Sequence, residues 1–195
     1  MNDFDVLVVG AGVAGMAVAH QLGRVAPSLR VGLVTLEPPG KAGATPWAQG
    51  GVAVAWGSDD SPALHAEDTL AAGAGLCRPE AVEVLTQEGP ARIQELLDLG
   101  AAFDRDAQGQ LELTREAAHQ RRRVVHAGDF SGREVARTLA SRLPDSVQVR
   151  VGRVQQLLTR ESRVVGILLD GQPLTASQVV LASGVGGVFP AGDQK

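Results

Sequence analysis

The sequence predicts an α/β fold, a Rossmann-like domain in which helices cover the faces of a parallel central sheet. The first observation is an apolar, β-branched run at 5–9, typical of a strand buried on both faces. The second is the order that follows: a glycine turn, a small-residue helix pattern over 13–25 and another β-branched run over 30–36. The third is composition, because 44% apolar and 21% charged residues allow a buried core. We assign residues 1–195 to one domain.

The middle of the chain is predicted to be helical after a long loop. Residues 38–60 are rich in Gly, Pro, Ala and Thr, which predicts an ordered loop of a length that usually serves a function. Residues 61–74 predict a helix with a serine cap and a proline in its first position. Residues 78–99 keep the helical spacing of apolar residues, and the pair Gly89 and Pro90 leaves open two helices or one kinked helix.

The last part of the chain is predicted to return to the first sheet. Residues 102–113 predict a hairpin, residues 115–123 a polar, exposed segment, and residues 131–143 a helix. Four strand-like runs follow, separated by turn residues, at 147–151, 153–159, 164–170 and 178–182. This order predicts a small antiparallel β excursion on the parallel sheet.

Charge and cysteine content exclude several classes of partner. The net charge is -4, aromatic residues are 3% and tyrosine is absent, so we expect a small-molecule partner and no nucleic acid. Cys77 is the only cysteine, which predicts a buried thiol, no disulfide, no metal site and a cytoplasmic location.

The uncharged run 6–23 contains four glycines and no basic segment precedes it, so we expect neither a membrane span nor a signal peptide. We interpret His20 and His65 as structural.

A dinucleotide fingerprint follows the first strand. In the GxGxxG pattern, Gly10 serves the turn, Gly12 the close approach of a pyrophosphate, and Gly15 the packing of helix on strand. The expected phosphate contacts at this helix start are Gly10, Gly12, Val13, Ala14 and Gly15. Glu37 ends the second strand, where a carboxylate accepts hydrogen bonds from a ribose diol and disfavours a 2'-phosphate. The alternative is a tight structural turn, and the unit by itself fits both FAD and NAD.

The loop after the second strand carries a further motif. Its small residues offer backbone amides to a planar ligand, with Thr45 and Gln49 as hydrogen-bonding side chains. The segment resembles the flavin loop of the succinate dehydrogenase, fumarate reductase and L-aspartate oxidase flavoproteins, whose signature includes AQGG. That resemblance implies a Rossmann-like FAD-binding domain, and the alternative is a Gly-rich surface loop. The cofactor contacts expected here are Lys41, Ala44, Thr45, Pro46, Trp47, Ala48, Gln49, Gly50 and Gly51.

Several separated motifs narrow the resemblance to the L-aspartate oxidase family. Segments 65–77, 113–126 and 129–134 are similar to its HxEDTLxAGAGxC, LTREGGHSxRR(I/V)xH and D-x-[ST]-G-R-E motifs, in the same order. Dehydrogenase and reductase members bond the flavin through a histidine five residues before the Gln of AQGG. Ala44 stands there, so the resemblance implies non-covalent FAD. The chain departs from the family where Ala117 and Ala118 replace two glycines and Gln120 replaces a serine.

The resemblance also implies residue roles. Glu116 would orient the substrate amino acid, and the alternative is a solvated acid beside the neighbouring arginines. His119 is a weaker catalytic candidate, as are His126, Arg122 and Arg123, since an exposed basic run is more often a solvated face. By the same analogy, the backbone of Val154 contacts adenine, and Ala182 and Gly184 form a turn near the cofactor.

The activity implied by this family is flavin-dependent oxidation of L-aspartate to iminoaspartate, the first step of de novo NAD biosynthesis. Electrons would pass to oxygen or fumarate, and the product to quinolinate synthase. We expect the chain to be an N-terminal portion, without capping and C-terminal helical domains, and to have little activity alone. The alternatives are a soluble fumarate reductase or succinate dehydrogenase-type flavoprotein, and a non-catalytic module that binds FAD or an ADP-like ligand.

Overall fold

The computed structural model describes residues 2–41 and 43–184. The chain forms two compact units, the first made of residues 1–47 and 135–195 and the second of residues 48–134. No helix of the described residues combines the length and the apolar character needed to cross a membrane.

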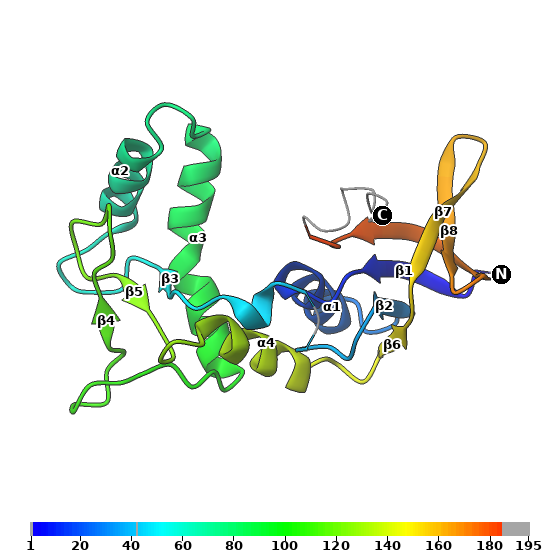
Figure 1. Cartoon of the computed structure of the whole chain (residues 1–195), viewed down its shortest axis with the longest axis horizontal. Helices are drawn as coiled ribbons and strands as arrows, with labels where there is room; N and C mark the ends of the chain where they lie inside the picture. Colours follow the sequence, from blue (N-terminus) through cyan, green and yellow to red (C-terminus); the bar gives the residue numbers. More distant parts are fainter. Residues whose placement is uncertain (1, 42, 185–195) are drawn as a thin grey trace, which may run out of the picture. The chain divides into compact units, whose positions relative to one another are not determined.

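The first unit is built on a mixed sheet that confirms the predicted α/β class. Its strand order is β6 (Val147–Val151), β2 (Val31–Thr35), β1 (Phe4–Val9), β9 (Gln172–Leu181), β8 (Arg163–Leu169) and β7 (Val154–Arg160) (Figure 1). The pairs β6–β2, β2–β1 and β1–β9 are parallel, whereas β9–β8 and β8–β7 are antiparallel. The antiparallel excursion is therefore present, and the last strand begins six residues earlier than the sequence pattern indicates, at Gln172 instead of Gln178.

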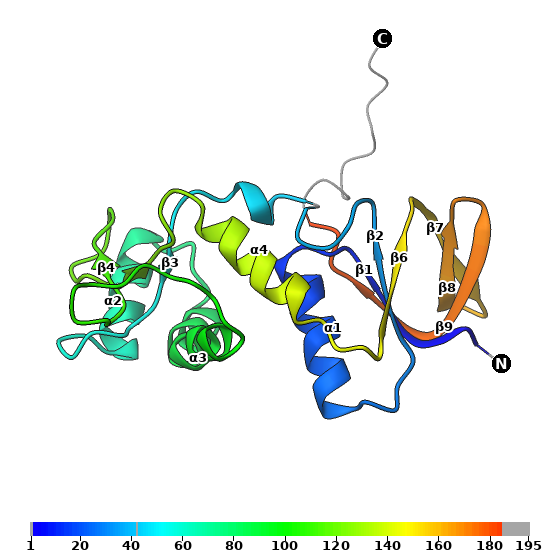
Figure 2. The same cartoon turned by 90° about the horizontal axis from the view of Figure 1, so that it is seen from below.

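Helix α1 (Val13–Val25) lies beside β1 and β2 (Figure 2). Its buried residues are small or flexible, namely Gly15, Met16, Ala19 and Gly23, so its backbone comes close to its neighbours. A buried cluster joins side chains of β1, β2, β8 and β9, including Phe4, Leu7, Val34 and Ile167. The sheet therefore has a continuous apolar core, which fixes the positions of the strand ends.

The second unit contains two long helices and a small sheet. Helices α2 (Pro62–Ala72) and α3 (Pro79–Asp98) lie side by side (Figure 1). The Ser61 hydroxyl accepts the Leu64 amide at 3.3 Å, which confirms the predicted serine cap. Strands β3 (Val52–Ala53), β5 (Val124–Val125) and β4 (Leu113–Thr114) form an antiparallel sheet with β5 in the centre.

Three segments can be compared with what the sequence predicted for them. Helix α3 runs through Pro90 without a break, so the single-helix alternative is the correct one. The predicted hairpin is present as an isolated antiparallel bridge between Arg105 and Leu111. Cys77 is half-buried, less than predicted, and its thiol lies 3.6 Å from the Thr69 carbonyl oxygen. The remaining elements are a short 3-10 helix, η1 (Thr45–Trp47), and the α-helix α4 (Ser131–Ser141).

Candidate functional site

The glycine turn between β1 and α1 is closely packed at two of its three fingerprint positions. Gly10 has φ +107°, and a Cβ there would collide with the carbonyl oxygen of Ala182. A Cβ on Gly15 would collide with the carbonyl oxygen of Gly10. The Ala182 amide donates to the Val9 carbonyl at 2.8 Å, which brings the end of β9 against the turn. Gly10 and Gly15 are therefore required by the fold itself.

Gly12 differs from its two neighbours in the motif. Its φ is -72°, which any residue adopts, and a Cβ at this position would have Thr45 Oγ1 as its nearest atom, at 3.5 Å. Gly12 occupies the N-cap of α1 without a capping side chain, and Val13 and Ala14 behind it are exposed. A glycine at a helix start lets a phosphate group approach the backbone closely, and the Val13 amide at this start is already capped by Thr45 Oγ1 at 3.1 Å.

One further predicted contact, Glu37, lies at the same edge of the sheet, and the chain that leads to another, Val154, passes it. Glu37 follows the carboxyl end of β2 and is exposed. Val151, at the end of β6, pairs with Thr35, and the Gly152 amide donates to the Thr35 carbonyl at 2.8 Å. The chain therefore passes this edge before β7 begins at Val154, whose side chain packs against the apolar cluster.

The loop after β2 folds back to the start of α1. The Val13 amide donates to Thr45 Oγ1 at 3.1 Å, which places η1 beside the glycine turn. Lys41 and Ala44 are exposed, Pro46 is half-buried, and Trp47 keeps 75% of its surface accessible. A large indole exposed next to helix amides is a surface on which a planar ligand can lie.

The AQGG segment begins the second unit. The Ala48 carbonyl accepts the Gly132 amide at 3.0 Å, while Gln49 is exposed. A Cβ on Gly51 would collide with Val124, so Gly51 is required by its packing on β5. A Cβ on Gly50, in contrast, would have no atom within 4 Å, which leaves the backbone of Gly50 open to a ligand.

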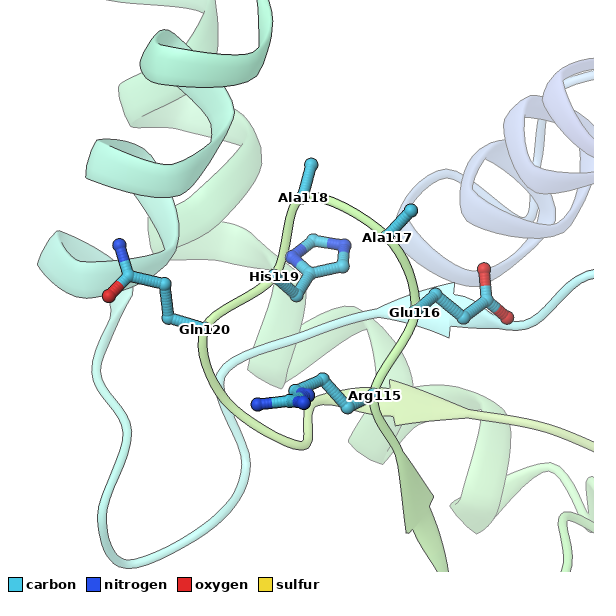
Figure 3. A pocket seen from close by; sticks show the side chains of 6 residues that line it. All are labelled: Arg115, Glu116, Ala117, Ala118, His119 and Gln120. Carbon is cyan, nitrogen blue, oxygen red and sulfur yellow. The ribbon is translucent and has the colours of Figure 1, made fainter.

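Residues 115–120 form an open loop between β4 and β5 and line a shallow hollow, as Figure 3 shows. The His119 ring points into the loop, whereas the carboxylate of Glu116 points outward. The His119 amide donates to the Glu116 carbonyl at 3.2 Å, which closes a tight turn. Ala118 has φ +69°, the left-handed conformation that favours glycine. Ala118 therefore stands in a strained backbone conformation.

The prediction that 115–123 is exposed throughout is wrong for Arg123. Its side chain is fully buried, with Nη2 2.8 Å from Asp60 Oδ1 and Nη1 3.3 Å from Asp68 Oδ2. Arg122, one residue earlier, is exposed as predicted. Arg123 directly precedes β5 and is buried together with Val124 and Val125. The basic run 121–123 therefore contributes one fully buried cation, Arg123, beside the exposed Arg122 and the half-buried Arg121.

Two histidines lie next to this buried ion cluster. The His65 and His119 rings meet edge to face with centroids 5.7 Å apart. Burial, followed by the positive charge of Arg123, lowers the pKa of His65. The Gln120 amide lowers the pKa of Asp68, burial opposes this, and the Arg123 charge adds to the lowering. The cluster thus keeps His65 neutral and Asp68 ionised near neutral pH.

A second pair lies where β5 ends. His126 Nδ1 is 2.7 Å from Asp104 Oδ2, and the same oxygen accepts the Gly128 amide at 2.7 Å. The Gly128 amide lowers the pKa of Asp104, burial opposes it, and His126 adds to the lowering. An ionised Asp104 makes Nδ1 the protonated nitrogen of His126. Among the described residues, the buried His126 Nε2 has no hydrogen-bond partner.

The sequence reasoning missed the three acids Asp60, Asp68 and Asp104. Asp68 lies inside the HxEDT motif, and this position could have revealed it. An acid on the inner face of a helix is buried and needs a charged or hydrogen-bonding partner. Among the described residues, no group of His, Cys, Asp and Glu is arranged to hold a metal ion.

The residues present fit a bound FAD in each unit taken separately. In the first unit, a Cβ on Gly12 would meet only Thr45 Oγ1, at 3.5 Å, and Glu37 stands at the same sheet edge. In the second, Gly50 leaves open backbone beside β5. Ala44 has only a methyl side chain and offers no atom for a covalent flavin bond.

Comparisons with known proteins agree with this geometry. The chain is 46% identical over 197 residues to an L-aspartate oxidase from Nostoc sp., covering 95% of this chain and 33% of the relative. It is 45% identical over 205 residues to an L-aspartate oxidase from Streptomyces coelicolor, covering 96% and 34%. The structure of quinol fumarate reductase FrdA from E. coli matches with a TM-score of 0.86 and 26% identity, covering 93% of this chain and 32% of that one. The chain therefore spans about a third of the length of the curated relatives.

A family described as FAD binding domain matches residues 5–192, which include the glycine turn, the AQGG segment and the 115–120 loop. This match covers nearly all of the sequence and names the cofactor FAD. The chain belongs to the FAD binding domain family, and its cofactor is FAD.

Proposed function

We propose that residues 1–195 are the FAD-binding domain of an L-aspartate oxidase that acts in the cytoplasm. The reaction converts L-aspartate to iminoaspartate, and oxygen or fumarate takes the two electrons. The product is an unstable imine, which suits direct use by quinolinate synthase in NAD biosynthesis. The observation that carries the proposal is the Thr-Arg-Glu loop at 114–116, in a chain 46% identical to an L-aspartate oxidase and with alanine at position 44.

The reaction requires two events at the substrate. The ammonium group of aspartate loses a proton, and a hydride leaves the α-carbon as the carbon–nitrogen double bond forms. Bound FAD supplies the hydride acceptor. The task left to the protein is to hold the amino group and the α-carbon in position, which lowers such barriers by roughly 7–11 kcal/mol.

Glu116 is the residue of this chain to which we assign substrate orientation. Its carboxylate is exposed at the hollow of the 115–120 loop, free to accept a hydrogen bond from the substrate ammonium. His119 faces into the same loop and is a weaker candidate for moving a proton. The FAD contacts proposed are the fingerprint residues, Glu37, the 41–51 loop, Val154, Ala182 and Gly184.

Non-covalent FAD binding is tested on the purified chain by absorption spectra before and after FAD addition and desalting. Retained flavin bands that move to the supernatant on acid precipitation support the proposal. Flavin that stays with the precipitated protein contradicts it. Hydrogen peroxide release from aspartate by the 195-residue chain is expected to be negligible, and steady release overturns the expected dependence on further domains.

Substrate choice is tested on a chimera that joins this chain to the remaining two-thirds of the Nostoc relative. We expect oxidation of aspartate and none of succinate. Glu116→Gln is expected to raise the KM for aspartate about tenfold, a loss of about 1.4 kcal/mol of substrate binding, with FAD retention unchanged. Glu112→Gln, a neighbouring acid, serves as the control. Oxidation of succinate alone would identify a dehydrogenase-type protein, and FAD binding without turnover a non-catalytic module.

A further inference from the structure

The 115–120 loop has few contacts of its own to hold Glu116 in place. Residues 115–118 are exposed, and the turn is closed by the 3.2 Å hydrogen bond from the His119 amide to the Glu116 carbonyl. Ala118 adds strain with its φ of +69°. The position of Glu116 therefore depends on how the two ends of the loop are fixed.

The end of the loop is hydrogen-bonded to α2 through the Asp68 carboxylate, beside the edge-to-face contact of His119 with His65. Asp68 Oδ2 accepts the Gln120 amide at 2.9 Å and lies 3.3 Å from Arg123 Nη1. Asp68 is 5% exposed and Arg123 0%, so little water competes for these contacts. A hydrogen bond from a backbone amide to an ionised acceptor is stronger than one to a neutral oxygen.

Arg123 is itself held from two sides. Its amide donates to the Thr114 carbonyl at 3.1 Å, which ties it to β4 at the beginning of the loop. Its guanidinium binds Asp60 Oδ1 at 2.8 Å, and that oxygen also accepts the Ser61 amide at 2.9 Å. Arg123 thus connects the start of α2, the start of the loop and the Asp68 carboxylate.

We propose that Asp68 is a positioning residue, which fixes the Gln120 end of the 115–120 loop and through it the location of Glu116. Arg123 keeps the carboxylate in the required orientation. The proposal rests on the proposed function only for the substrate that Glu116 meets. The loop anchor itself is a property of this chain, and it is measurable without substrate.

Amide hydrogen exchange on the 195-residue chain tests the anchor. Asp68→Ala removes the acceptor, and we expect the Gln120 amide to exchange at least about tenfold faster, since an exchanging amide must first lose its hydrogen bond. Asp68→Asn keeps an oxygen without the charge, so an intermediate rate is expected. Glu67→Gln, a change at the exposed adjacent acid, is expected to match the unchanged chain.

Loop motion is measured with a nitroxide label on Ala117→Cys in a Cys77→Ala background. Adding Asp68→Asn is expected to increase label mobility, whereas adding Glu67→Gln leaves it unchanged. In the unaltered chain, the Gln120 amide proton resonance is expected to shift as Asp68 takes up its proton in acid. This last measurement needs no variant and remains informative if a substitution at Asp68 prevents folding.

Two outcomes overturn the proposal. One is an exchange rate of the Gln120 amide and a mobility of the label that are the same with Asp68 and with either of its replacements. The other is an equal rise in exchange throughout α2 and α3, which indicates general loosening of the unit and not release of one loop. In the chimera, Asp68→Asn is expected to raise the aspartate KM with FAD retention unchanged. If that chimera oxidises no aspartate, the proposed function fails while the exchange and label results still decide the anchor.

Discussion

A guanidinium buried between two carboxylates makes Arg123 sensitive to substitution. Replacing it with methionine leaves Asp60 and Asp68 buried without their cation. Breaking a buried ion pair by removing one partner costs about 3–5 kcal/mol. We expect Arg123→Met to lower the free energy of unfolding by about that amount, measured by urea titration.

Arg122, the residue before Arg123, provides a matched control. Arg122 is exposed, so Arg122→Met is expected to change the free energy of unfolding by less than about 0.5 kcal/mol. Equal effects of the two substitutions would show that Arg123 is not buried among acids in solution.

The strained Ala118 of the 115–120 loop is expected to respond in the opposite direction, because its replacement can increase stability. A left-handed conformation costs an L-residue about 1–2 kcal/mol, and glycine recovers this at the expense of about 0.4–1 kcal/mol of unfolded-state entropy. Because Ala118 has φ +69°, we expect Ala118→Gly to stabilise the protein by about 0.5–1 kcal/mol. Ala117→Gly, outside that conformation, is expected to destabilise it slightly. Thermal unfolding of both variants tests this difference in sign.

At the level of elements, substitutions at two glycines of the β1–α1 connection are expected to differ in effect. Gly15→Ala should mainly lower stability, and Gly12→Ala should mainly weaken FAD binding. Gly15→Ala forces a methyl group against the Gly10 carbonyl, so α1 must move away from β1. Such overpacking costs about 1–3 kcal/mol, which a lowered unfolding midpoint reports. The methyl of Gly12→Ala makes only an ordinary van der Waals contact, 3.5 Å from Thr45 Oγ1, and is expected to change stability by less than about 0.5 kcal/mol.

The Gly12→Ala substitution is also expected to change FAD affinity. If FAD phosphates bind at Gly12 as proposed, the methyl of Gly12→Ala obstructs them, and we expect FAD affinity to fall about tenfold or more. Titration of FAD into each variant measures this change. A Gly12→Ala variant that binds FAD as tightly as the unchanged chain would place the phosphates elsewhere.

For the whole molecule, the lowered pKa values predict loss of stability in acid. Below about pH 6.5, unfolded His65 takes up a proton before the folded form does, so stability falls as the pH drops toward the folded pKa. Hydrogen bonds and charges also lower the pKa values of Asp3, Asp5, Asp68 and Asp104. The stability that these carboxylates contribute is present above their ordinary value of 3.8 and is lost below it.

Urea unfolding at a series of pH values measures this dependence. We expect a first decrease in the free energy of unfolding between about pH 7 and 5, and a second decrease below about pH 4. His65→Gln is expected to remove the first decrease and keep the second. An unfolding free energy that stays constant across the first interval would contradict a buried, neutral His65.

The amino-acid sequence by itself determined the parallel unit around the glycine turn. Apolar β-branched runs, a helix of small residues and glycines at fixed spacing act between near neighbours in the chain, so β1, α1 and β2 agree with the predicted ranges within one or two residues. The motif order also indicated the FAD binding family that the comparisons then showed.

Only the tertiary structure decided which polar residues are buried and paired. Arg123 meets Asp60 across 63 residues of sequence, and Gln120 meets Asp68 across 52. A run of arginines carries no local information about such distant acids, so the sequence pattern predicts an exposed cation where the fold buries one. Likewise, Gly50 faces open space while the adjacent Gly51 is packed on Val124, because the chain that comes to lie against each of these glycines is set by the folded arrangement and not by its sequence neighbours.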